Sequence, residues 1–113
     1  MKREYRDYVK DILDAINKIE IFTQGIDDFE SFLKDEKTEL AVVKLFENIG
    51  EAVKKIPDEI KNKHSGTPWK DIAGMRDILI HEYFGLDAEV IWKTIKEDLP
   101  TIKPVIQKIW EEI

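Results

Sequence analysis

The sequence has no cysteine, so neither a disulfide framework nor a thiolate metal site can form. Its two histidines, His64 and His81, are well separated and do not form the His-x-x-x-His spacing of a zinc site. The chain also lacks a glycine-rich phosphate loop, because its turn sequence SGTPW is too short and contains no lysine. We therefore expect neither a metal nor a bound cofactor.

Long hydrophobic runs are also missing. No apolar stretch approaches the ~18 residues that a membrane span needs, and the first ten residues, MKREYRDYVK, lack the apolar region of a signal peptide. We therefore expect a cytoplasmic protein that does not enter a membrane. With 113 residues and 42% hydrophobic content, the chain can build one core but not two ordinary ones. Residues 1–113 are predicted to form a single domain.

The net charge of −6 argues against a protein that coats nucleic acid by bulk electrostatics. The charge is unevenly distributed, because residues 54–76 contain six basic and three acidic side chains and so carry +3. This basic region could receive a phosphate backbone. A charge cluster of this kind is more often a solvated helix face, and both interpretations remain open at this point.

The apolar residues recur at three- and four-residue intervals, which is typical of amphipathic helices. This spacing predicts a first helix from Tyr5 to Phe22, closed by Gly25, and a third helix over residues 42–56 that ends before Pro57. Asp27, with Glu30 three residues later, predicts the capping box of a short second helix.

Turn residues predict the remaining boundaries. Thr67 and Pro68 are expected to begin a fourth helix, with Pro68 at its first position, and Gly85 is expected to end it. Asp87 is expected to begin a fifth helix. Pro100 and Pro104 should interrupt the last segment, giving a bend or a new helix near residue 100. Because no segment alternates with a two-residue period, the predicted fold is all-α, an antiparallel bundle of four to five main helices.

The fourth predicted helix has apolar residues nearly all round its circumference. Such a helix is normally buried on most sides. A small bundle cannot cover all of these sides by itself, and a symmetric dimer is the commonest arrangement that would do so. The sequence therefore predicts a homodimer.

The same helix carries the residues that are best suited to catalysis: Arg76, Asp77, His81 and Tyr83. A histidine can take the proton of a ribose 2′-hydroxyl, and an arginine can hold the phosphate, so this set suits metal-independent cleavage of RNA. Asp77 lies four residues before His81 and can orient its imidazole. On a regular helix, Arg76 and His81 project about 140° apart and lie about 7.5 Å apart along the axis. From spacing alone, however, a core histidine and a salt-bridged arginine are the better explanation of the pattern.

The segment RDILIHEY, from Arg76 to Tyr83, matches the pattern Arg-x4-His-x-Tyr. Together with NIGEAVKKIP at 48–57, PWKDIAGMRDILIHEYFGLD at 68–87 and VIWKTIKEDLP at 90–100, it resembles the HepT-like branch of the HEPN superfamily. The resemblance implies an all-α homodimer whose motif lines a cleft between protomers. It also implies a toxin ribonuclease that is paired with a minimal nucleotidyltransferase antitoxin.

Carried over by position, the resemblance makes Arg76 and His81 the catalytic pair. Tyr83 becomes the residue that the antitoxin adenylylates, and Asp77 a supporting residue where relatives often have asparagine. Two interpretations follow. The first is an RNA endonuclease that leaves a 2′,3′-cyclic phosphate and a 5′-hydroxyl. The alternative is a non-catalytic helical module that binds a nucleotidyltransferase partner.

Overall fold

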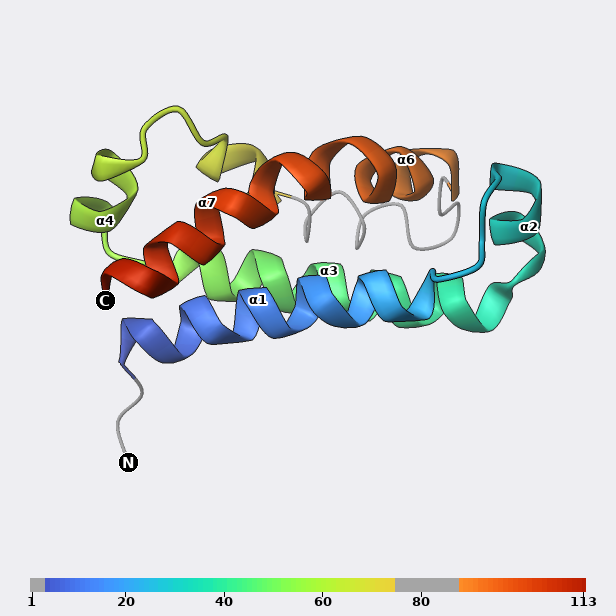
Figure 1. The fold of residues 1–113 in the computed structure, drawn as a ribbon, viewed down its shortest axis with the longest axis horizontal. Helices are drawn as coiled ribbons and strands as arrows, with labels where there is room; N and C mark the ends of the chain where they lie inside the picture. Colours follow the sequence, from blue (N-terminus) through green and yellow to red (C-terminus); the bar gives the residue numbers. More distant parts are fainter. Residues whose placement is uncertain (1–3, 75–87) are drawn as a thin grey trace.

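The computed structural model describes residues 4–74 and 88–113. Its two longest helices, α1 (Tyr5–Phe22) and α3 (Glu36–Lys54), run antiparallel and side by side, and α7 (Leu99–Glu112) packs against α1 (Figure 1). No strand occurs in these two ranges. The predicted all-α fold is therefore confirmed for the described part of the chain. Within that part, no helix has the length and apolar character needed to cross a membrane.

Shorter helical segments close the two ends of the bundle. At one end, α2 (Phe29–Lys34) contacts α6 (Ala88–Lys93), and at the other, α4 (Asp58–Lys63) follows the end of α3 (Figure 1). A helical segment over residues 69–74 lies between α4 and the end of the first described range. One π-helical turn, η2 (Thr94–Asp98), joins α6 to α7.

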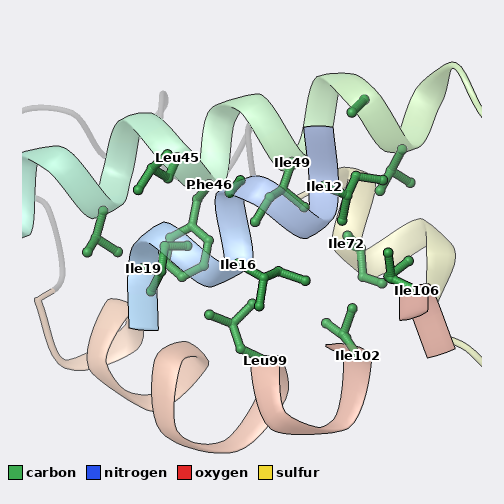
Figure 2. Packing of buried hydrophobic residues seen from close by; sticks show 14 of the residues in the cluster. Ile12, Ile16, Ile19, Leu45, Phe46, Ile49, Ile72, Leu99, Ile102 and Ile106 are labelled. Carbon is green, nitrogen blue, oxygen red and sulfur yellow. The ribbon is translucent and has the colours of Figure 1, made fainter. Parts of the chain in front are cut away.

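The core lies between α1, α3 and α7 (Figure 2). The α1 residues Ile12, Ile16 and Ile19 are fully buried, as their three- and four-residue spacing predicts. They meet buried residues from the other two helices, and Figure 2 labels the following: Leu45, Phe46, Ile49, Leu99, Ile102 and Ile106. Burial of this continuous apolar cluster is the main stabilising contribution to the bundle.

The turn after α1 forms as predicted, but the start of α2 differs by one residue. Thr23 caps α1, because its buried hydroxyl donates to the Ile19 carbonyl at 2.8 Å, and Gly25 adopts φ = 86° in the following turn. The N-cap of α2 is Asp28 and not the predicted Asp27, since the Asp28 carboxylate accepts from the Ser31 amide at 2.8 Å. Two adjacent aspartates offer the same cap, and the pattern alone could not choose between them.

A single residue, Asp35, separates α2 from α3 and caps the latter. Its carboxylate accepts from the Thr38 hydroxyl at 2.8 Å and from the Thr38 amide at 3.1 Å. These hydrogen bonds favour the ionised form and lower the pKa of Asp35 below its usual value of 3.8. The amide of Ser31 lowers the pKa of Asp28 in the same way. Both carboxylates therefore favour helix initiation most strongly when they are charged.

The prolines interrupt the chain less than predicted. A new helix does begin near residue 100, since α7 starts at Leu99 after the π turn, whose last bond runs from the Leu99 amide to the Thr94 carbonyl. Pro104, however, lies inside α7 and does not end it. Proline lacks the N–H of an i to i−4 hydrogen bond, but Ile102 and Ile106 on either side of Pro104 are buried in the core and hold this stretch helical. The prediction that Pro68 is the first residue of a helix is wrong by one position, because the helical segment begins at Trp69.

Candidate functional site

The predicted catalytic residues Arg76 and His81, with Asp77 and Tyr83, lie outside the described residues. The homodimer was inferred from apolar residues around the fourth predicted helix, and of these only Ile72 and Ala73 are described. The structure does describe the two segments that enter and leave this part of the chain.

The segment before the motif is anchored in the core. Ile72 has a relative exposure of 1% and points into the cluster between α1 and α7 (Figure 2). The Trp69 indole N–H donates to the carbonyls of Lys61 and His64, at 3.2 Å and 3.1 Å, which ties the segment to the end of α4. Gly74, the last residue of the first described range, lies two positions before Arg76 in the sequence. The chain therefore leaves a fixed helical segment immediately before the motif.

The segment after the motif is anchored as well. Ala88 and Ile91 of α6 are buried, and the Trp92 ring packs on the fully buried Phe32, with ring centroids 5.2 Å apart. Ala88 follows the last motif residue, Tyr83, by five positions. Core contacts thus fix both ends of the stretch that carries the four predicted site residues.

The groove beside the first anchor is acidic. Pro68, Asp71, Ile72, Asp98, Thr101 and Ile102 line a space of about 150 Å³ between the 69–74 segment and α7. Its two charged side chains, Asp71 and Asp98, would repel a phosphate. We therefore do not assign substrate phosphate binding to this groove.

His64, to which sequence analysis gave no role, has a structural position. Its Nε2 lies 3.2 Å from a carboxylate oxygen of Glu112, and the His64 side chain is only 12% exposed. This contact joins the residue that ends α4 to the last turn of α7. The two residues are far apart in the sequence, so no local pattern could have revealed the pair.

The described ranges contain no group of three or more histidine, aspartate or glutamate side chains that could hold a metal ion. They do contain an aromatic and lysine cluster that sequence analysis missed. Lys96 Nζ lies 4.6 Å from the centroid of the Trp92 ring. The i to i+4 spacing of these two residues in the fifth predicted helix was the available signal.

Comparisons with known proteins identify the family. The family model described as "Ribonuclease HepT-like" matches residues 12–109. A Thermococcus cleftensis protein named "Probable ribonuclease HepT" is 51% identical over 109 residues, which cover 96% of this chain and 98% of the relative.

Two further relatives have similar coverage. A Methanocaldococcus jannaschii protein, provisionally named as an RNase, is 43% identical over 99% of this chain and 92% of its own length. A Caldanaerobacter subterraneus protein, also provisionally named as an RNase, is 44% identical over 95% of both chains. No solved structure matches. On the family match and these identities, the chain belongs to the ribonuclease HepT-like family.

Proposed function

We propose that this protein is a metal-independent RNA endonuclease and the toxin of a toxin–antitoxin pair. One observation carries the proposal: a complete Arg-x4-His-x-Tyr motif occurs in a chain of the ribonuclease HepT-like family. The names of the relatives support the ribonuclease chemistry. We place the activity in the cytoplasm, where an RNA substrate is available.

In the proposed mechanism, His81 removes the proton from a ribose 2′-hydroxyl, and the 2′-oxygen attacks the adjacent phosphorus. The bond from phosphorus to the 5′-oxygen breaks, and this oxygen leaves as a hydroxyl after taking up a proton. The products are a 2′,3′-cyclic phosphate and a 5′-hydroxyl. Arg76 stabilises the additional negative charge on the phosphate in the transition state, and Asp77 orients the His81 ring.

We propose that the active form is a homodimer. Arg76 and His81 would project about 140° apart on a regular helix, so a single helix does not direct both toward one phosphate. Two copies facing each other across a two-fold axis can bring the arginine of one to the histidine of the other. Light scattering should then report about twice the chain mass of 13.3 kDa, and a monomer at micromolar concentration would contradict the shared site.

We further propose that a minimal nucleotidyltransferase antitoxin silences the protein by adenylylating Tyr83. An attached AMP would add bulk and negative charge seven positions from Arg76, on the same side of a regular helix, and so obstruct phosphate entry. Mass spectrometry after co-expression should locate the added nucleotide on Tyr83. Modification of Tyr5 or Tyr8 instead would show that the assignment is wrong.

The catalytic assignment is tested by substitution. His81→Ala should reduce RNA cleavage by roughly 10²- to 10⁴-fold, the usual contribution of a general base. Arg76→Ala should cause a similar loss, and Arg76→Lys should restore only part of the activity because lysine lacks the two-pronged contact. Cleavage should persist in EDTA. Circular dichroism must show that each variant folds like the parent.

Normal folding and undiminished cleavage in both alanine variants would refute the roles of Arg76 and His81. A parent protein that binds a nucleotidyltransferase without cleaving any RNA would favour the alternative, a non-catalytic helical module.

Mixing the two inactive variants tests whether the dimer shares its sites. In a mixed dimer, one composite site receives both substitutions, and the other keeps the Arg76 and His81 of the parent. Random exchange of protomers should therefore restore about one quarter of the parental activity if each site draws on both chains. If each site uses one chain alone, mixing restores nothing.

A further inference from the structure

A small shelf of aromatic and charged side chains lies where α2 meets α6 and η2. We call it the Trp92 shelf. The open space over it is about 310 Å³ and is lined by Phe29, Glu89, Trp92, Lys93, Lys96 and Glu97. This volume is at the lower end of the range for small-molecule sites. The shelf is therefore large enough for a small molecule of about the size of one nucleotide.

The Trp92 indole is a fixed platform within this shelf. It packs on Phe32 with a centroid distance of 5.2 Å and an interplanar angle of 32°, and Phe32 is fully buried. The core therefore holds the indole in place, while Trp92 itself stays partly exposed. A partly exposed aromatic ring is a surface on which a nucleobase can stack.

A lysine ammonium is held directly over this ring. Lys96 Nζ lies 4.6 Å from the Trp92 centroid, and Lys96 has no ion pair within residues 4–74 and 88–113. The neighbouring Lys93, by contrast, is 3.9 Å from a Glu97 carboxylate oxygen. A phosphate would attract the Lys96 ammonium more strongly than the ring does. Movement of the ammonium toward a phosphate would expose the ring face for stacking.

The charges on the shelf favour a nucleotide over a general polyanion. Glu89 and Glu97 offset Lys93 and Lys96, so the shelf has no strong positive field to attract any acidic molecule. A peptide of acidic residues alone could reach Lys96 but has no aromatic ring to place on Trp92. A nucleotide supplies both a base for the ring and a phosphate for the ammonium.

We propose that the Trp92 shelf binds one nucleotide of a single-stranded RNA, with its base on Trp92 and its phosphate at Lys96. This inference rests on the proposed function, because it takes RNA as the substrate. Trp92 follows the motif residue Tyr83 by nine positions, so their Cα atoms are at most about 32 Å apart. The shelf would bind RNA without taking part in the chemistry.

The test uses a labelled single-stranded RNA of about 12 nucleotides with 2′-O-methyl sugars. This RNA cannot undergo attack by its 2′-oxygens, so fluorescence anisotropy measures binding independently of cleavage. Trp92→Leu should weaken binding about 5-fold or more, whereas Trp92→Phe should bind nearly as the parent does. Lys96→Ala should also weaken binding. Lys44→Ala is the matched control, because it removes the same charge from a side chain on α3 that is 72% exposed.

Tryptophan fluorescence provides a second measurement. RNA binding should quench the parent, and the Trp92→Phe variant should lose this quenching while it still binds, although Trp69 and Trp110 remain. This result keeps the proposal testable even if Trp92→Leu fails to fold, as judged by circular dichroism.

Three results would overturn the proposal. The first is equal weakening by Lys96→Ala and Lys44→Ala, which would indicate general electrostatic attraction. The second is unchanged quenching in Trp92→Phe, and the third is tighter binding of polyglutamate than of the RNA. Failure of the parent to cleave unmodified RNA would refute the proposed function separately, because the binding experiment requires no cleavage.

Discussion

Replacing Ile72 by alanine should destabilise the protein substantially, because this side chain fixes the segment that leads into the motif. Ile72 is 1% exposed, and truncating a buried isoleucine to alanine usually costs about 2–5 kcal/mol. The groove of about 150 Å³ that Ile72 borders gives neighbouring side chains room to relax. We therefore expect a loss in the lower part of this range, about 2–3.5 kcal/mol.

Urea unfolding followed by circular dichroism measures this loss. For a small domain, a denaturant dependence of roughly 1–3 kcal/mol per molar predicts that the midpoint falls by about 0.7–3.5 M. Ile16→Ala, at a fully buried position on α1 in the centre of the core, should lower it further. The exposed Lys70, in the same segment as Ile72, supplies the control, and Lys70→Ala should change stability by no more than about 0.5 kcal/mol. Equal midpoints for Ile72→Ala and Lys70→Ala would refute the anchoring role of Ile72.

Three further predictions concern stability and pH. Asp35→Asn should lower the melting temperature at pH 7, and the difference from the parent should shrink as the pH falls below about 4. The reason is that Thr38 lowers the pKa of Asp35, so the stabilisation by the charged Asp35 is lost when this carboxylate is protonated. A constant difference down to about pH 2 would contradict this. Burial raises the pKa of Glu39 above its usual 4.5, so its charged form is disfavoured in the fold, and Glu39→Gln should raise the melting temperature at pH 7 but not below about pH 4. His64→Ala should lower the free energy of unfolding in urea by about 1 kcal/mol through loss of the contact with Glu112. Glu112→Ala should then cost less in the His64→Ala variant than in the parent, and equal costs in the two would show that the contact contributes nothing.

The long helices could be predicted because each buries one continuous face. Ile12, Ile16 and Ile19 recur at three- and four-residue intervals and are all fully buried in α1. The predicted bounds of α1 are confirmed, but the pattern does not predict burial at the helix ends. Tyr5 and Phe22, at the first and last positions of α1, are 36% and 45% exposed. A periodic pattern shows which side of a helix is apolar, but not how far its partner helices extend.

Tertiary contacts between distant residues could not be predicted from local patterns. Phe32 supports Trp92 although the two belong to α2 and α6, and only the folded bundle brings them together. The continuation of α7 through Pro104 was missed for another reason. A proline costs a helix one backbone hydrogen bond and a clash with the preceding turn, and the buried Ile102 and Ile106 that offset this cost become visible only in the fold.

The roles of Arg76 and His81 rest on the family pattern, since regular helix geometry alone directs these side chains apart. The family match spans residues 12–109, so it includes the motif together with the anchoring residues Ile72 and Ile91 on its two sides. Anchoring and catalysis can therefore be separated by experiment. Substitution of Ile72 should lower the free energy of unfolding, whereas substitution of His81 should lower cleavage while circular dichroism stays unchanged. If His81→Ala instead destabilised the fold as much as Ile72→Ala does, His81 would be a core residue, and the interpretation drawn from spacing alone would be the better one.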